Sequence, residues 1–430
     1  MRFLTTAAAA ALTYKPIKES RVAVIGGSIG GCAVAIALKK VGVEKVDVFE
    51  RSQANDLADR GLGIGFPGPI FQQLVQKDML DDDMKFVAVQ KRHWIVEDGT
   101  RVGKVAYQHP MLAQLHNWGL LWHQLRKRVD DSDYHAGVTV DVGSSKIHQG
   151  TSSTSPAKVE LFDTDQSSLG EYDFCIQAEG ALAGADNQAS YAGYVLWRGS
   201  YPIQTHPEID IGDMPDTFFT PVYENGHGIV YLMPTSNSDE GDYRMNYAFY
   251  THTPPGLEGE YLHKVTRASQ ITPEQLEFLN DTVISKVPRR FQDIIKIPIN
   301  EGTISIHPIL DRVPETFVTM EGLGLLLGDA GAVLRPHTGS GTTKAVTEAL
   351  LIEKLAQEPD ATWKTVSEAY QADRHGDGVG KVAYGERLGR AQVLETPDWK
   401  EMASSDFESW LAAQVADSGN YMYKDMKKTG

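Results

Sequence analysis

The sequence predicts a mixed α/β fold with a parallel βαβ unit, an interleaved antiparallel sheet and a helical C-terminal segment. An apolar strand at residues 22–25 runs into a glycine-rich turn and then an apolar helix, which is the order of a βαβ unit. Between Tyr191 and Tyr250 the chain becomes rich in aromatic strand-forming residues, which predicts the antiparallel sheet. A second apolar strand, residues 324–327, ends in Gly328-Asp329 before a glycine-bracketed helix start.

The first strand, turn and helix have the layout of a dinucleotide-binding unit. Gly26 allows the tight turn, Gly31 lets the helix pack close to the sheet, and the free N–H groups of the helix would face a diphosphate. The next strand, residues 46–50, ends in Glu50, 19 residues after Gly31, where a carboxylate can bind both hydroxyls of a ribose. Ser28 replaces the usual middle glycine, and its hydroxyl could donate to a phosphate. The alternative is an ordinary strand–turn–helix in which Glu50 is a solvated charge.

Length and composition are those of a globular enzyme. The 430 residues can hold two domains, and 41% hydrophobic and 23% charged residues are ordinary values. The net charge of −16 argues against a nucleic-acid or anionic-membrane partner, because either would be repelled. No apolar run approaches the roughly 20 residues of a membrane span.

The sequence also predicts features of the termini and of the compartment. Cys32 and Cys175 are expected to be buried free thiols, consistent with a reducing, cytoplasmic compartment. No His, Cys and acid cluster has metal-ligand spacing, so no metal site is expected. Residues 1–20 are expected to be a disordered leader, since the first strand starts directly after them.

Turn signals and hydrophobic periods place the remaining elements in order. Residues 60–65, with alternate glycines, predict a loop whose backbone lies close to a flat or bulky group, or else a flexible loop. The tail after residue 362 is charged and helical, with Trp399, Phe407 and Trp410 as anchoring side chains. The other predicted elements are a helix at 69–77, a hairpin from strands at 91–96 and 101–105, an amphipathic helix at 120–129, strands within 138–162 and at 174–178, helices between 272 and 297, a strand at 303–307 and a helix through 355.

Three features together resemble the single-component FAD-dependent aromatic hydroxylases, the para-hydroxybenzoate hydroxylase family. They are the βαβ start with Glu50, the Gly-Asp-Ala strand end at 328–330, and the Pro-x-x-Gly-x-Gly helix start at Pro336. Within that family the sequence is most similar to the dihydroxypyridine hydroxylase branch, through its Gly-Gly-Ser turn, the string at residues 191–199 and the Arg-Pro-His at 335–337. The resemblance covers about residues 21–356.

The resemblance implies FAD bound in extended form by a Rossmann-like domain with a mixed sheet. That domain would comprise residues 21–90, 103–190 and 301–356, and an antiparallel-sheet substrate domain would comprise 91–102 and 191–300. Residues 357–430 would form the C-terminal helical region. Asp329 would accept from the ribityl hydroxyls, and the amides of 339–341 would stabilise the negative charge of reduced flavin. The implied FAD-binding residues are Gly26, Ser28, Gly30, Gly31, Glu50, Arg51, Asp329, Pro336, Gly339 and Gly341.

Two positions depart from the family pattern. An internal Asp-Gly motif, usually followed by Ser and Arg and linked to both FAD diphosphate and nicotinamide cofactor, reads Glu179-Gly180 and continues as Ala-Leu-Ala-Gly-Ala. A helix arginine that commonly contacts FAD is replaced by Trp122. These departures bear on the nicotinamide interaction more than on FAD binding.

The implied reaction is hydroxylation of an electron-rich aromatic or N-heteroaromatic ring through a C4a-hydroperoxyflavin, with NADH or NADPH as reductant and molecular oxygen. The protein would hold the ring in line, exclude water and assist deprotonation of a ring hydroxyl. Candidates for the assisting base are His337, His227, Tyr231 and His307, although a histidine beside a glycine turn is more often only hydrogen-bonded or solvated. Arg198 would anchor a substrate anion or form a structural ion pair.

Other functions remain compatible with the sequence. A flavoprotein of the same fold can be an epoxidase, an oxidase or a reductase, and the altered Glu179-Gly180 segment keeps these possibilities open. A non-enzymatic dinucleotide-binding protein would show no turnover with any reductant. The aromatic-rich strands of the middle sheet could form either a plain core or a ligand site. The sequence predicts either a monomer or a homodimer.

Overall fold

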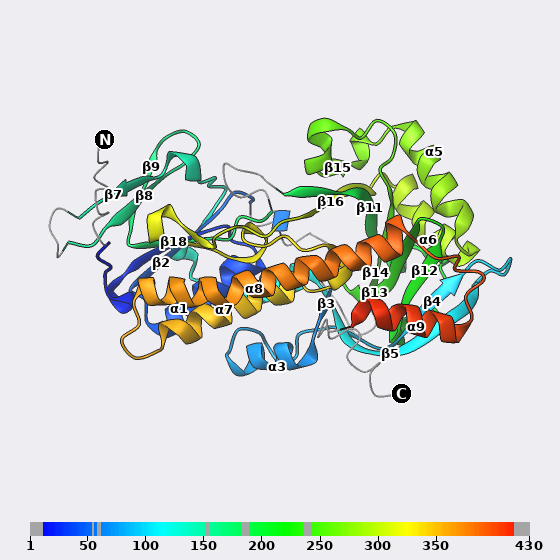
Figure 1. Ribbon diagram of the computed structural model, residues 1–430, viewed down its shortest axis with the longest axis horizontal. Helices are drawn as coiled ribbons and strands as arrows, with labels where there is room; N and C mark the ends of the chain where they lie inside the picture. The colour runs from blue at the N-terminus through cyan, green and yellow to red at the C-terminus, as the bar shows by residue number, and fades with distance from the viewer. Residues whose placement is uncertain are drawn as a thin grey trace, which may run out of the picture.

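The computed structural model describes residues 12–53, 56–57, 62–150, 155–181, 189–235 and 242–416, and all structural statements concern these residues. Their strands form three sheets with helices packed around them, so the predicted α/β class is confirmed (Figure 1). Cys32 and Cys175 are buried free thiols, as predicted. The helices are α1 (Ile29–Val41), α3 (Gly68–Gln76), α4 (Trp118–Arg126), α5 (Pro273–Thr282), α6 (Arg289–Asn300), α7 (Gly341–Ala356), α8 (Trp363–Gly389) and α9 (Ser404–Val415).

The first sheet is mixed and has six strands. Its four central strands are parallel, because each is a short apolar run followed by a crossover that returns the chain to the same edge. Helices α1 and α7 pack against this sheet through apolar side chains, which form one continuous core with it. In order, the strands are β17 (Val318–Thr319), β18 (Gly324–Leu326), β10 (Phe174–Gln177), β1 (Arg21–Ile25), β2 (Lys45–Glu50) and β6 (Tyr134–Ala136).

The second sheet has nine strands and is antiparallel apart from the β4–β12 pair, which is parallel. Aromatic and β-branched side chains of its buried face pack against α5, α6 and α9. A separate three-stranded sheet contains β7 (Lys146–His148), β8 (Lys158–Phe162) and β9 (Ser168–Tyr172). The order of the nine strands is β15 (Thr266–Arg267), β16 (Ser305–Asp311), β11 (Ser190–Pro202), β14 (Tyr243–His252), β13 (Gly226–Pro234), β12 (Thr217–Tyr223), β4 (Val87–Val96), β5 (Lys104–Asn117) and β3 (Gly63–Phe66).

Some elements differ from the sequence predictions. Residues 60–65 were expected in a loop, but residues 63–65 belong to strand β3, which pairs with β5. The expected close approach is present, since a Cβ on Gly63 would lie 2.3 Å from the Tyr231 hydroxyl. Residues 60 and 61 lie outside the described part of the chain. The predicted domain limits also differ from the sheets, because β3, β5 and β16 join the larger sheet although their residues were assigned to the FAD-binding domain.

Residues 12–20 are part of the fold, so the prediction of a disordered leader is wrong for this stretch. The Thr13 carbonyl accepts from the amide of Ala157 at 3.1 Å, and Ile17 is buried. The Tyr14 hydroxyl donates to the carbonyl of Gly322 at 3.2 Å. The reason is that Leu12 and Tyr14 pack against a small apolar core between the first sheet and the three-stranded sheet. Residues 1–11 of the predicted leader lie outside the described residues.

The long helix α8 connects the two large sheets (Figure 1). At its start, the Trp363 ring stacks on Phe174 of β10, with ring centroids 4.2 Å apart. At its end, Leu388 belongs to the core of the nine-stranded sheet. The chain then packs α9 against β4 and β5 through an aromatic cluster of Trp94 with Trp399, Phe407 and Trp410, which confirms the predicted anchoring of the tail. No helix in the described ranges is long and apolar enough to cross a membrane.

The Trp363 contact generates a stability prediction. We expect Trp363→Ala to lower the free energy of unfolding by about 3–5 kcal/mol, because it empties a fully buried ring site and leaves the Ser20 hydroxyl without the indole N–H that it accepts at 3.0 Å. Leu112→Ala removes an exposed side chain and should change the free energy by less than about 0.5 kcal/mol. Denaturant unfolding of both variants measures the difference, and equal effects would contradict the role given to α8.

Candidate functional site

Two cavities adjoin between the sheets. The first has a volume of about 640 Å³ and lies along the carboxyl ends of the parallel strands. The second has a volume of about 300 Å³ and lies against the nine-stranded sheet. Asp329, Gly341 and Thr342 line both of them, so the two cavities share a wall at the start of α7. A ligand that extends along the first cavity can therefore present one end to a second ligand.

The glycine turn after β1 is held rigidly. Gly26 has φ +103°, which only glycine adopts without strain, and an added Cβ would lie 2.4 Å from the Ala178 carbonyl oxygen. The Gly27 carbonyl accepts from the Trp122 indole at 2.9 Å and from the Tyr134 hydroxyl at 3.0 Å. Trp122, which stands where the family often has arginine, therefore supports the turn rather than lining a cavity.

Glu50 ends β2 and faces the same turn. Its carboxylate accepts from the Gly27 amide and from the Ser52 amide, both at 2.8 Å, so one N–H group orients each oxygen. Each oxygen keeps a second acceptor position, and Glu50 lines the first cavity together with Ser28 and Arg51. Ser28 caps α1 without a side-chain capping bond, which leaves its hydroxyl available to a ligand. This corner can bind a vicinal diol and an adjacent anion.

The Gly-Asp corner is fixed by a buried ion pair on α7. Lys344 and Glu348 are each about 1% exposed, and their charged atoms are 3.3 Å apart. The Lys344 ammonium donates to the Gly328 carbonyl at 2.6 Å, while the Gly328 amide donates to Glu348 at 2.7 Å. Both backbone hydrogen-bonding groups of Gly328, the residue before Asp329, are thus held by one helix. We call this arrangement the Gly328 clamp.

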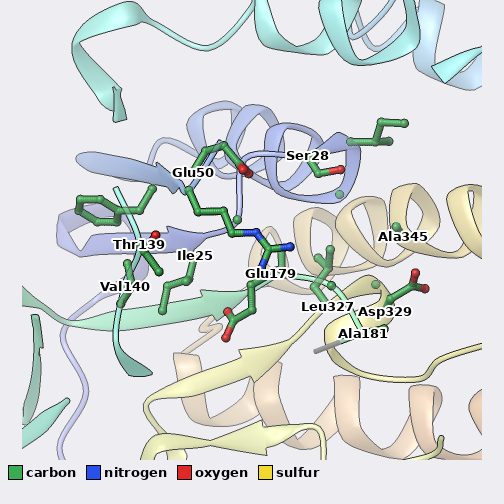
Figure 2. Close-up of a pocket in the computed structure, with 18 of the residues that line it drawn as sticks. Ile25, Ser28, Glu50, Thr139, Val140, Glu179, Ala181, Leu327, Asp329 and Ala345 are labelled. Carbon is green, nitrogen blue, oxygen red and sulfur yellow. The ribbon is translucent and has the colours of Figure 1, made fainter. Parts of the chain in front are cut away.

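The residues of the first cavity fit an extended dinucleotide. Figure 2 shows Glu50 and Asp329 on different sides of the group of lining side chains, with Ser28 between them. The N-terminus of α1 also opens here through Ile29 and Gly30, so its amides and dipole favour a diphosphate in the middle. Desolvation by the surrounding protein raises the pKa of the Asp329 carboxyl, and the positive charges of Lys344 and Arg312 partly oppose this increase.

Glu179 follows β10 and lines the same cavity (Figure 2). Burial raises the pKa of its carboxyl to about 7, and the charge of Arg51 only partly opposes the shift. One carboxyl oxygen, Oε2, is buried without a hydrogen-bond partner among the described residues. Glu179 is therefore close to half protonated at neutral pH in the ligand-free protein. Residues 182–185 of the altered family motif lie outside the described ranges.

The second cavity collects basic and aromatic side chains. Arg92, on β4, donates through Nε to the Thr220 hydroxyl at 2.8 Å. Arg198, on β11, is half-buried on the cavity wall and forms no ion pair with a carboxylate of the described residues. The only acidic residue on the described lining is Asp329, at the shared wall. The described lining therefore carries more positive than negative charge.

The predicted base candidates His337 and His227 both line the second cavity. His337 Nε2 lies 2.8 Å from the Tyr194 hydroxyl, and the His337 ring packs 4.3 Å from the ring of Tyr250. A side chain on Gly389 would collide with the Tyr194 hydroxyl, at 2.2 Å, so glycine there lets α8 approach. Burial lowers the pKa of His337 well below its usual value and that of His227 to about 3, so both are neutral.

Most of the other predicted site residues line one of the two cavities. Tyr231 also lines the second cavity, and burial raises its pKa, so its hydroxyl stays protonated. His307 lines neither cavity and hydrogen-bonds to Ser305 at 3.0 Å. Gly31 also lines neither, because it packs against the Gly26 carbonyl. Gly26, Ser28, Gly30, Glu50, Arg51, Asp329 and Gly341 line the first cavity, and Asp329, Pro336, Gly339 and Gly341 line the second.

The sequence reasoning missed several lining residues. The first cavity is closed by Trp118 and by residues 138–143, which have no motif of their own. The second cavity contains Arg92, Asn246 and Gln392, which were read only as parts of strands or of the charged tail. The hydrophobic period around these residues identifies the strand or helix that carries them. It does not identify the distant part of the chain against which that strand or helix packs. Only Arg92 could have been found from the sequence, because residues two apart on a strand lie on the same face and Trp94 is expected to be buried.

Variants of the Gly328 clamp are expected to lose stability and FAD affinity to different extents. We expect Lys344→Met to lower the free energy of unfolding by about 3–5 kcal/mol, because it leaves Glu348 buried and unpaired, and to weaken FAD binding. Adding Glu348→Leu should recover stability but not FAD affinity, because the Gly328 peptide still lacks both partners. Lys77→Met is the matched control, since Lys77 pairs at 2.8 Å with Glu353 of the same helix and does not touch Gly328. Full FAD affinity in the double variant would contradict positioning by the clamp.

The raised pKa of Glu179 leads to a prediction of how FAD affinity depends on pH. Below pH 7 its carboxyl is mostly neutral, and above pH 7 it is ionised and repels a diphosphate in the same cavity. FAD affinity of the apoprotein should therefore fall as pH rises from 6 to 8, by roughly fivefold for about 1 kcal/mol of repulsion. Fluorescence titration at both pH values measures this change. Glu179→Gln should remove the slope, and an unchanged slope in this variant would assign it to another group.

The comparisons with known proteins agree with this geometry. A squalene epoxidase family model matches residues 262–370. The 2,6-dihydroxypyridine 3-monooxygenase of Paenarthrobacter nicotinovorans is 25% identical over 349 residues, which cover 78% of this chain and 82% of the relative. The FAD-dependent urate hydroxylase of Klebsiella oxytoca is 27% identical over 363 residues, which cover 78% of this chain and 81% of the relative.

Solved structures show the same fold. The 2,6-dihydroxypyridine-3-hydroxylase of Arthrobacter nicotinovorans has a TM-score of 0.72 at 20% identity, covering 90% of this chain and 95% of that chain. The Klebsiella pneumoniae protein HpxO, in complex with FAD and uric acid, has a TM-score of 0.69 at 19% identity, covering 95% of this chain and 96% of that chain. The likenesses in sequence indicate an FAD-dependent aromatic hydroxylase, as the motifs predict, and the solved structures share the fold of this chain.

Proposed function

We propose that this protein is an FAD-dependent monooxygenase that hydroxylates an anionic, electron-rich N-heteroaromatic ring, with NADH or NADPH as reductant. The observation that carries the proposal is Arg198, a half-buried arginine without a carboxylate ion pair among the described residues, on the wall of the second cavity. A partly buried cation without a counter-ion is costly, because protein solvates it less well than water does. A ligand anion in the cavity would supply the missing charge.

The chemistry of the ring explains why an anion is useful. When bound, FAD would supply oxygen activation after its reduction by NAD(P)H. The ring carbon must be nucleophilic to accept oxygen, and ionisation of a ring hydroxyl raises its electron density. Arg198 and Arg92 favour the ionised form, because both bring positive charge to the same cavity. The shared wall at Asp329 and Gly341 would hold the ring against the cofactor and exclude water.

The two cavity histidines support a hydrogen-bonding role more than full proton transfer. A base with a pKa of about 3, as for His227, does not retain at neutral pH a proton taken from a ring hydroxyl. The charges on the arginines would instead lower the pKa of the ring hydroxyl itself. The assignment of His337, His227 or Tyr231 as a base stays a prediction.

The relatives support a heteroaromatic substrate. Their names specify a dihydroxypyridine and urate, which are hydroxylated or oxo-substituted nitrogen rings that ionise readily. An apolar alkene, the substrate class expected of an epoxidase, would leave the two arginines buried against hydrocarbon. The choice between NADH and NADPH, the state as monomer or homodimer and the cytoplasmic location also stay proposals.

A turnover screen tests the function. Purified FAD-loaded protein is mixed with NADH or NADPH and with 2,6-dihydroxypyridine, uric acid or salicylate, and reductant consumption, oxygen uptake and product mass are measured. We expect at least one nitrogen ring to stimulate reductant consumption and to gain one oxygen atom from labelled O2. Peroxide without hydroxylated product would favour an oxidase, and bound flavin without any turnover would favour a binding protein.

Variants of Arg198 test the charge argument. Arg198→Gln should raise KM for the ionised ring by roughly 10- to 100-fold, which corresponds to the loss of a charge-assisted hydrogen bond, and Arg198→Lys should recover part of it. Arg289→Gln changes an exposed arginine at the start of α6 and should leave KM unchanged. An Arg198→Gln enzyme with normal KM would contradict the proposed anion site.

A further inference from the structure

The C-terminal region contributes a polar side chain to the second cavity. Gln392 lies in a π-helical turn, Arg390–Leu394, that follows α8 directly. It is 1% exposed and lines the cavity, and its Nε2 has no hydrogen-bond partner among the residues described. A fully buried amide N–H without a hydrogen-bond partner lowers the stability of the folded protein. π-Helical turns are frequent at functional sites. The amide is therefore placed for a ligand.

The π-helical turn also connects Gln392 to a cavity histidine. The Gln392 backbone carbonyl lies 3.3 Å from His227 Nδ1. A carbonyl oxygen can only accept, so Nδ1 of the neutral His227 carries the hydrogen and Nε2 is left as an acceptor. The same turn thus fixes the tautomer of one side chain and buries the amide of another.

His337 offers the opposite hydrogen-bonding group. The Tyr194 hydroxyl lies 2.8 Å from His337 Nε2 and can donate its hydrogen to this nitrogen. Nδ1 of the neutral His337 then carries its hydrogen, and it is buried without a partner among the described atoms. The second cavity therefore contains a histidine donor, a histidine acceptor and a carboxamide, and Asp329 at the shared wall is the only acidic residue of its described lining.

We infer that Gln392 is a specificity-determining residue that recognises the lactam edge of the ring, its adjacent N–H and C=O groups. This inference rests on the proposed function and specifies its substrate class. A carboxamide presents one acceptor and one donor side by side, and a lactam presents one donor and one acceptor in the same spacing. Two parallel hydrogen bonds can then form, as between glutamine and the edge of adenine.

A carbocyclic ring cannot satisfy this amide. Resorcinol has the ring size and hydroxyl spacing of 2,6-dihydroxypyridine but has C–H where the pyridine has ring nitrogen. Binding of resorcinol would leave Gln392 buried without a partner, which is the situation in which polar sites discriminate strongly. The anion of the pyridine keeps its N–H, so lactam recognition and the anion preference of Arg198 are compatible.

The matched pair of rings provides the test. FAD-loaded wild type, Gln392→Met and Gln392→Glu are titrated with 2,6-dihydroxypyridine and with resorcinol, and binding is followed by the change in flavin absorbance. Turnover, as KM and kcat, is measured in parallel. Wild type should prefer the pyridine by roughly 10-fold or more, and Gln392→Met should lose this preference through a higher KM for the pyridine with little change for resorcinol. Gln392→Glu, of the same shape but without the donor, should lose it too.

Controls separate the possible failures. Arg390→Leu alters an exposed side chain of the same turn and should keep the preference, while FAD content and melting temperature show whether each variant is folded. Equal binding of the two rings by wild type, or an unchanged preference in a folded Gln392→Met, would overturn the inference. If wild type binds the pyridine selectively but hydroxylates no ring, the proposed function fails and the role of Gln392 in recognition stands.

Discussion

Parallel pairing of four strands brings the cofactor corners of this protein together. Strands β18, β10, β1 and β2 lie side by side in that order, and all four run in one direction. Their carboxyl ends therefore open at one edge of the sheet, where Asp329, Glu179, the Gly26 turn and Glu50 follow in sequence across the strands. The outer two strands are three strand spacings apart, roughly 14 Å. This span suits an extended dinucleotide better than a mononucleotide.

The second cavity is built from other parts of the chain than the first. Its lining comes from strands of the nine-stranded sheet and from the end of α8, which are distant in sequence from the glycine turn. The buried ion pair between Arg335 and Asp311, at 2.5 Å, connects the loop before α7 to β16 of that sheet. The Gly328 clamp connects the same loop region to the first sheet. The start of α7 therefore receives fixed positions from both sheets, and it forms the wall that the two cavities share.

The sequence was most informative where local spacing carries the chemistry. Glu50 and Asp329 each stand at the end of a short apolar strand, so their position at one sheet edge follows from the βαβ pattern. Gln392 could not be found in this way, because its role depends on a π-helical turn at the end of a long helix and on long-range packing against His227. The strand at 63–66 was missed since alternate glycines lower strand propensity, and pairing with β5 decides its structure.

Binding of the two halves of FAD tests the central claim most directly. Apoprotein of wild type, Glu50→Gln and Asp329→Ala is titrated calorimetrically with ADP and with riboflavin. The shared-cavity account predicts that Glu50→Gln weakens only ADP binding, that Asp329→Ala weakens only riboflavin binding, and that FAD displaces both. If both variants weaken the same half, or if FAD displaces only one of the two, the two corners do not hold one dinucleotide.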